Sequence, residues 1–184
     1  NYSNNNLPLF GISDHIFKTF DDRPNLLTKR DIRVQILADL ELPKNGVIWD
    51  IGAGCGSIGL EALKLRPNLD LFCIDKRIGS KELILENSKR LGVKPKFILE
   101  ENIINTLNTK NLRSFETPNR LLIGGCDKKT KLEIINTLAQ GMSIGDIIVI
   151  PIIDIQTIKE LKEELENKNF KTNLNLIQTY KSLS

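Results

Sequence analysis

Short apolar runs alternate with segments of helical period along most of this chain. The runs occupy residues 47–51, 70–74, 97–99, 120–123 and 146–153. Runs that can be buried on both faces, separated by helices, are typical of a parallel sheet that is covered on both sides. Because connections between parallel strands are right-handed, the sequence predicts an α/β fold with a doubly wound, mostly parallel sheet.

The segments between these runs carry apolar residues three or four positions apart, as amphipathic helices do. We expect helices at residues 28–40, 58–65, 80–91, 131–138 and 155–165. The first should begin at Thr28, because a hydroxyl followed three residues later by an acid is a helix-start pattern. After the last helix, residues 174–180 are expected to form a final strand.

The chain has 184 residues, which is enough for one domain with its own core. Residues 1–6 are polar and rich in asparagine, so we expect a linker over residues 1–8 and one domain over residues 9–184. Such a linker is typical of a domain that was cut from a longer polypeptide.

Composition disfavours several classes of protein. No apolar run approaches the roughly 20 residues that span a bilayer, and no signal peptide opens the chain, so a cytoplasmic protein without a membrane partner is expected. The net charge is only +3 and basic residues are scattered among acids, so no nucleic-acid partner is expected. Three separated cysteines and one histidine, His15, predict no metal site.

The first apolar run ends in a glycine-rich loop that begins at Asp50. Alternating glycines allow a tight turn and let a ligand touch bare backbone, and the next helix presents free N–H groups. Asp75 follows 19 residues after Gly56, at the end of the second run, where a carboxylate can accept both hydroxyls of an adenosine ribose. The predicted cofactor-binding residues of the loop are Gly52, Ala53, Gly54, Cys55 and Gly56.

Two kinds of adenosine cofactor fit this pattern. Gly54, Gly56 and Gly59 match the dinucleotide fingerprint G-x-G-x-x-G. Asp50, however, would repel a pyrophosphate and could hold the amino group of a methionine moiety. The chain also lacks a second domain for a hydride-transfer substrate. S-adenosyl-L-methionine is therefore favoured over a nicotinamide cofactor. The alternatives without a ligand are that the glycine loop is only a tight turn and that Asp75 only caps the next helix.

Several motifs together resemble one methyltransferase family. They are Leu9-Phe-Gly-Ile-Ser-Asp14, Leu27-Thr-Lys-Arg30 with Arg33, Trp49-Asp-Ile-Gly-Ala-Gly-Cys-Gly-Ser57, and Ile123-Gly-Gly125. From about Leu9 to about Tyr180, the chain resembles the precorrin-6Y C5,15-methyltransferase (decarboxylating) family. More narrowly, it is similar to the part that also exists alone as the cobalt-precorrin-6B C15-methyltransferase.

The resemblance implies a class I S-adenosylmethionine-dependent methyltransferase with a Rossmann-like fold. Its members methylate C15 of a precorrin-6 type tetrapyrrole and decarboxylate the acetate on C12, in cobalamin (corrin) biosynthesis. Fused members carry an N-terminal domain that methylates C5; by this resemblance, the Asn-rich start would be the linker to such a domain, and the chain would be the C-terminal part of a longer fused enzyme. Standalone members are homotetramers, so a homo-oligomer is expected.

Carried over by position, the resemblance adds Thr28, Asn102 and Ile103 to the cofactor contacts. The chain departs from the family pattern at Ser13, where proline is usual, and at Glu101-Asn102-Ile103, where Gly-Asp-Ala is usual. The family also tends to continue through a further edge strand beyond Ser184.

The substrate of such an enzyme is a polycarboxylate. Lys29, Arg30 and Arg33 are candidate anchors for its acid side chains, and solvated charges are the alternative. Methyl transfer from a sulfonium depends mainly on alignment, so we expect no catalytic triad and assign no catalytic residue. His15 is a weak candidate proton donor for the decarboxylation, since a surface histidine is the more ordinary interpretation.

The fourth apolar run ends in Gly124, Gly125 and Cys126, which would leave room for a flat ring. This segment lacks the Asn-or-Asp, double-proline and aromatic motif of enzymes that methylate base amino groups, and no cysteine follows a proline as a cytosine-C5 enzyme requires. An RNA methyltransferase and a non-catalytic cofactor-binding module remain the alternatives.

Overall fold

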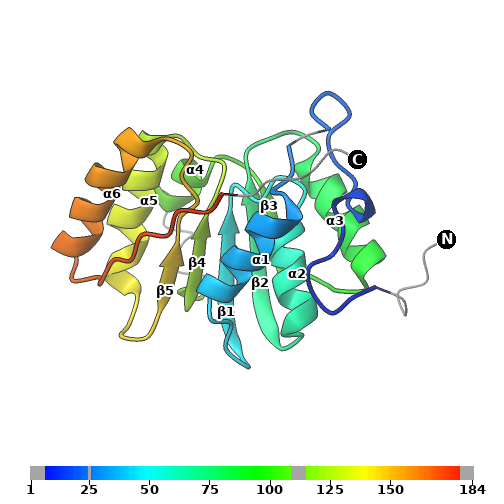
Figure 1. Cartoon of the computed structure of the whole chain (residues 1–184), viewed down its shortest axis with the longest axis horizontal. Coiled ribbons are helices and arrows are strands. Elements are labelled where there is room, and N and C mark those ends of the chain that lie inside the picture. The colour runs from blue at the N-terminus through cyan, green and yellow to red at the C-terminus, as the bar shows by residue number, and fades with distance from the viewer. Residues whose placement is uncertain (1–6, 25, 109–114, 179–184) are drawn as a thin grey trace.

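The computed structural model describes residues 7–24, 26–108 and 115–178, without the side chain of residue 108. Its centre is a five-stranded parallel sheet in the order β3-β2-β1-β4-β5 (Figure 1). The strands are β1 (Gly46–Ile51), β2 (Leu69–Asp75), β3 (Phe97–Glu100), β4 (Arg120–Ile123) and β5 (Ile147–Val149). The doubly wound parallel sheet predicted from the sequence is confirmed.

The strand order reverses beside β1. The chain moves outward from β1 through β2 to β3, and then returns to the other side of β1 to form β4 and β5. In such sheets, ligands bind beyond the carboxyl ends of the strands at the point of reversal. This crevice lies between the ends of β1 and β4.

Helices cover both faces of the sheet (Figure 1). One face carries α1 (Arg30–Asp39), α2 (Ser57–Leu65) and α3 (Ser80–Leu91), which pack against Ile48, Leu71, Cys73 and Leu122. The other carries α4 (Ile103–Asn108), α5 (Lys128–Leu138) and α6 (Ile155–Asn167), which pack against Trp49, Phe72, Ile74 and Leu121. Neighbouring strand residues therefore face opposite layers, as the pleat requires.

Arg33 of α1 anchors the segment before the first helix. Its side chain is fully buried and its Nε donates to Glu61 Oε2 at 2.9 Å. Its other donors bind Asp14 Oδ1 and the carbonyl oxygens of Ile12 and Thr28. Glu61 Oε1 accepts from the backbone N–H groups of residues 11 and 12. This network fixes the chain around Ile12, itself fully buried, against α1 and α2.

The structure corrects three local predictions. The first helix begins at Arg30 with Lys29 as its N-cap, and the Thr28 carbonyl accepts from Arg33 instead of opening the helix. Residues 103–108, for which no helix was predicted, form α4 because Ile103 and Leu107 bury against the sheet. Residues 174–178 are not a strand, and Leu174 and Leu176 are exposed; residues 179–180 lie outside the described residues.

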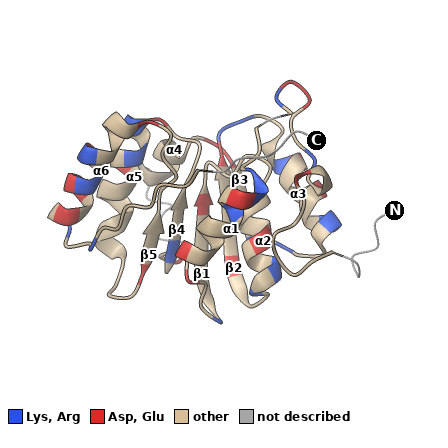
Figure 2. Cartoon of the chain, in the orientation of Figure 1, with Lys and Arg blue, Asp and Glu red and all other residues tan. Residues whose placement is uncertain are grey.

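The remaining expectations concern the N-terminal linker, membrane-spanning helices and the distribution of charge. Residues 1–6 of the expected linker lie outside the described residues, whereas Leu7 packs against the core. Within the described ranges, no helix is long and apolar enough to cross a membrane. Figure 2 shows basic and acidic residues interspersed, most plainly along α6.

Candidate cofactor and substrate site

The glycine loop after β1 folds tightly against the end of β2. The N–H groups of Gly52 and Ala53 both donate to the Ile74 carbonyl, at 2.8 and 3.1 Å. Gly52, Gly54 and Gly56 have φ values of +76°, +60° and +78°, which L side chains rarely adopt. The predicted need for glycine in this turn is therefore met at all three positions.

The loop touches the turn that follows β4. A Cβ on Gly52 would lie 2.9 Å from the backbone nitrogen of Gly125, so only glycine allows this approach. A Cβ on Gly54 would meet nothing within 4 Å, so this part of the loop is open. The structure thus brings together the predicted cofactor loop and the predicted substrate turn.

Asp75 ends β2 beneath the loop and is only 3% exposed. Its Oδ2 accepts from Gly54 N at 2.7 Å and from Arg77 Nη1 at 3.2 Å. Its Oδ1 accepts from Arg77 N at 2.9 Å. The carboxylate is therefore fixed where the glycine loop opens, and it does not cap α3, whose N-cap is Gly79.

Asp50 lies in the interior, one residue before the end of β1. It is 2% exposed, and its Oδ2 accepts from Gly59 N of α2 at 3.0 Å. Burial raises the pKa of the Asp50 carboxyl to about 7, the Gly59 hydrogen bond lowers it, and the nearby Asp75 raises it. Gly59 permits this close packing, because a Cβ there would lie 2.8 Å from Asp50 Oδ2.

An open cleft lies beside the loop at the carboxyl ends of the strands. Of the predicted residues, its lining includes Gly52, Asp75, Asn102, Ile103, Gly125 and Cys126. Asn102 Oδ1 accepts from Ile104 N at 3.1 Å at the start of α4. Ile103 is 4% exposed and joins the core, so its bulk serves the packing of α4 as well as the cleft.

The lining residues that were not predicted include Lys76, Arg77 and Thr130. Lys76 and Arg77 directly follow Asp75, so their position next to the cofactor acid was a usable signal. Glu101, noted before only as a departure from the family pattern, also lines the cleft.

Lys131 supports the turn after β4, which was predicted to contact the substrate, and Lys131 itself was not predicted. This residue of α5 is 7% exposed, and its Nζ donates to the carbonyl oxygens of Gly124 and Cys126. Burial lowers the pKa of Lys131 and raises the pKa of the Cys126 thiol. A buried lysine is rarely predicted from sequence, because long charged side chains are usually exposed.

The cationic anchors predicted at the start of α1 do not line this cleft. Arg33 is fully buried and its guanidinium is bound by the chain itself, so it is not available to a substrate.

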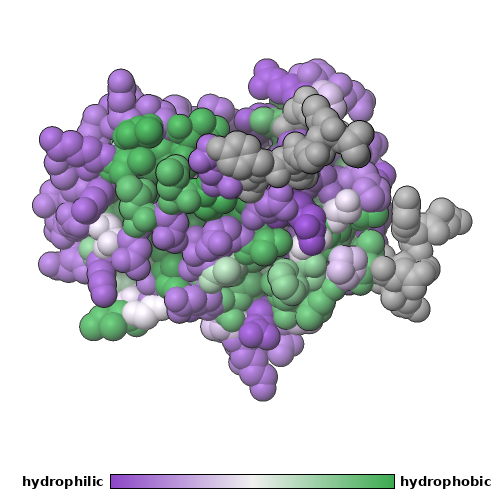
Figure 3. All heavy atoms as spheres, in the orientation of Figure 1, coloured by the Kyte–Doolittle hydropathy of each residue, from purple (hydrophilic) through white to green (hydrophobic). Residues whose placement is uncertain are grey.

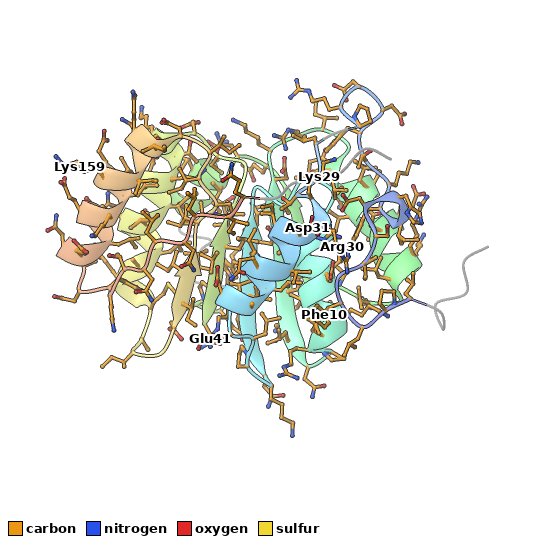
Figure 4. All side chains as sticks on the ribbon, viewed as in Figure 1. Phe10, Lys29, Arg30, Asp31, Glu41 and Lys159 are labelled. Atoms are coloured by element: carbon orange, nitrogen blue, oxygen red, sulfur yellow. The ribbon has the colours of Figure 1, made fainter. Side chains whose placement is uncertain are left out.

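The other residues predicted near the start of α1 lie at the surface or are half-buried. Figure 4 shows Lys29, Arg30 and Asp31 together at the amino end of α1. Arg30 Nε donates to the Gly11 carbonyl at 2.6 Å, and Thr28 is half-buried. Exposed His15 contacts Ser13 Oγ through its ring, at 2.9 Å.

The donors at the loop fit an adenosine cofactor that carries an amino acid group. Asp75 offers a carboxylate to a ribose diol, and the open Gly54 leaves space for a ligand against the backbone. The Asp50 carboxyl attracts an ammonium group and repels a pyrophosphate when it is ionised, and burial raises its pKa to about 7. In the described ranges, His, Cys, Asp and Glu form no group of three that could hold a metal ion.

The reversed parallel sheet and the glycine loop with its acid are the architecture of class I S-adenosylmethionine-dependent methyltransferases. Residues 19–181 match the family model of the precorrin methyltransferase domain. The chain therefore belongs to the precorrin methyltransferase domain family.

Individual relatives agree with this assignment. The chain is 32% identical over 165 residues to the "probable cobalt-precorrin-6B C(15)-methyltransferase (decarboxylating)" of Saccharolobus solfataricus, covering 87% of this chain and 78% of the relative. A protein of the same name from Pyrobaculum aerophilum is 30% identical, with 88% and 79% covered. The crystal structure of a precorrin-6y C5,15-methyltransferase from Geobacter metallireducens matches with a TM-score of 0.76 and 28% identity, covering 90% of this chain and 83% of that one.

Proposed function

We propose that this chain uses S-adenosyl-L-methionine to methylate C15 of a precorrin-6 type tetrapyrrole and couples this to decarboxylation of the C12 acetate, in cobalamin biosynthesis. The membership in the precorrin methyltransferase domain family and the names of the relatives support this reaction. The observation that carries the proposal is the contact between Gly52 of the glycine loop and Gly125 of the turn after β4. This contact supports an arrangement in which the proposed donor loop and the proposed substrate turn share one cleft.

The donor side of the cleft is assigned to the residues of the loop and its neighbours. Asp75 accepts the ribose hydroxyls, Asp50 faces the amino group of the methionine moiety, and Asn102 and Ile103 lie along the adenine. The backbone of residues 52–56 lines the rest of the cofactor. When bound, the cofactor supplies an electrophilic methyl group on a sulfonium.

The acceptor side is assigned to Gly124, Gly125 and Cys126. The two glycines lack side chains that would fill the space above Gly52, so a flat macrocycle can approach the loop. Lys131 holds this turn by binding two of its carbonyl oxygens. These residues act by aligning the ring carbon with the methyl group, and alignment alone can supply several kcal/mol of barrier lowering.

The test is a direct assay with purified protein, methyl-labelled S-adenosylmethionine and a precorrin-6 type tetrapyrrole, offered with and without cobalt. Mass spectrometry should find a tetrapyrrole that has gained one labelled methyl group and lost one carbon dioxide. Asp75→Asn should abolish most turnover, whereas Arg66→Gln, between the end of α2 and the amino end of β2, should not. Labelling of RNA instead, or cofactor binding without any turnover, would contradict the proposal.

We further propose that the enzyme is a homo-oligomer, a tetramer as the family resemblance implies. Exposed apolar side chains support self-association, because large apolar patches usually mark interaction surfaces. Figure 3 shows an apolar area over the β5 and α6 side of the molecule, and Ile153, Ile155, Leu174 and Leu176 are exposed. Light scattering coupled to size-exclusion chromatography should give a tetramer; a monomer at micromolar concentration would contradict this.

A further inference from the structure

Arg77 bridges the two sides of the cleft. Its Nη1 lies 3.2 Å from Asp75 Oδ2, and its Nη2 lies 3.9 Å from the position that a Cβ on Gly125 would take. The side chain is 26% exposed, in contrast to 2% for its partner Asp75. The guanidinium therefore stands between the acid assigned to the ribose and the turn assigned to the substrate.

The hydrogen bonds of Asp75 leave too little capacity for a ribose diol. A carboxylate offers about four acceptor positions, two on each oxygen. Three are taken, by Gly54 N and Arg77 Nη1 on Oδ2 and by Arg77 N on Oδ1. A diol that binds both oxygens needs one position on each, so Oδ2 must give up one donor. The contact with Arg77 Nη1 is the longest of the three, and it involves a side chain that can swing away.

We propose that Arg77 exchanges partners during the binding sequence: the ribose displaces its guanidinium from Asp75, and the freed guanidinium then binds a carboxylate of the tetrapyrrole. This inference rests on the proposed function. Its consequence is ordered binding, because the anchor for the substrate is released only when the cofactor is in place.

The charges around the cleft favour this second role. Arg33 is fully buried and bound within the chain, and neither Lys29 nor Arg30 lines the cleft.

Arg77 and its exposed neighbour Lys76 do line the cleft. The charge of Lys76 acts on Cys126 and Asp127 across the cleft. Arginine is well suited to the exchange, because its planar fork matches carboxylates. Lys131 is already bound to the carbonyl oxygens of the turn, whereas the Arg77 guanidinium lines the cleft and approaches Gly125.

The first test is calorimetric titration of S-adenosylhomocysteine, the product of methyl transfer, into wild type, Arg77→Gln and Arg66→Gln. Removal of the competing guanidinium should lower the Kd of S-adenosylhomocysteine by up to about fivefold, the range expected for a partly exposed ion pair. Arg66→Gln removes the same charge far from the cleft and should leave this Kd unchanged. An unchanged or higher Kd for Arg77→Gln would overturn the exchange.

The second test measures coupling between the two ligands. Titration of a precorrin-6 type tetrapyrrole should give a lower Kd for wild type and Arg66→Gln when S-adenosylhomocysteine is saturating. In Arg77→Gln this enhancement should disappear, whereas a merely structural role would leave the ratio of the two Kd values unchanged. Enhancement that survives in Arg77→Gln would overturn the proposal.

The proposed function and the exchange of Arg77 partners would fail with different experimental results. If wild-type protein does not bind S-adenosylhomocysteine, the proposed function fails. If wild type binds it and turns over the tetrapyrrole, but Arg77→Gln behaves like Arg66→Gln, only the exchange fails.

Discussion

Two arginine–carboxylate pairs in this molecule have similar chemistry and different surroundings. Arg33 and Glu61 meet at 2.9 Å with both side chains 0% exposed, whereas Arg77 and Asp75 meet at 3.2 Å at the edge of the cleft, with the arginine 26% exposed. Arg33 also binds Asp14 and two backbone carbonyls, so the chain occupies its donors. For Arg77, the structure describes a single side-chain hydrogen bond, the one to Asp75.

The difference separates a pair that holds the fold from a pair that can be exchanged. A buried charge that loses its partner is costly, because nothing else solvates it. A partly exposed guanidinium that leaves its partner is solvated by water, so its release costs little. Burial and the number of donors in use therefore distinguish the two roles, although both pairs join an arginine to a carboxylate.

Glu61→Gln tests the structural pair. It leaves the fully buried Arg33 without its principal counter-charge, and we expect the free energy of unfolding to fall by about 3–5 kcal/mol. Urea denaturation followed by circular dichroism measures the change. A loss below about 1 kcal/mol would mean that the Arg33 network is not the anchor described here.

A third buried carboxylate, Asp50, sharpens the comparison, because no Lys or Arg forms an ion pair with it in the described part of the chain. Burial raises its pKa from 3.8 to about 7. Between these values the unfolded chain releases a proton that the folded chain keeps. Stability should therefore fall as pH rises through this window, by about 4 kcal/mol in all.

The Asp50 contribution is isolated by the difference between wild type and Asp50→Asn. The free energy of unfolding of each protein is measured by urea denaturation at several pH values from about 4 to about 8. Wild type should lose stability relative to Asp50→Asn as pH rises, and the difference should level off above about pH 7. Parallel curves would show that the Asp50 carboxyl titrates normally in the fold.

Arg77→Gln should have the smallest effect on stability. Because this arginine is partly exposed and its partner Asp75 keeps the hydrogen bond from Gly54, we expect the free energy of unfolding to change by less than about 1 kcal/mol. Denaturation in parallel with Glu61→Gln checks this directly. A loss as large as that of Glu61→Gln would erase the distinction between the two pairs.

Features that depend on a few neighbouring residues could be predicted from the sequence, whereas features that depend on contacts between distant segments could not. The glycine loop and Asp75 were predictable, because tight turns and strand ends leave signals over a few residues. The role of Arg33 was not, since its burial depends on Glu61 and Asp14, which are distant in sequence. The short helix α4 was missed because six residues carry too little periodicity. A strand was wrongly predicted at residues 174–178 because Leu174, Leu176 and Ile177 resemble a strand pattern, although the segment forms no strand in the structure.

The most direct test of the central claim is the affinity of S-adenosylhomocysteine for wild type and Asp75→Asn, measured by calorimetry on proteins whose folding is checked by circular dichroism. The account predicts saturable binding by wild type and a Kd at least about tenfold higher for Asp75→Asn, because the ribose hydroxyls lose a charged acceptor. Equal affinity in two folded proteins would contradict it, since the acid at the end of β2 would then not hold the cofactor.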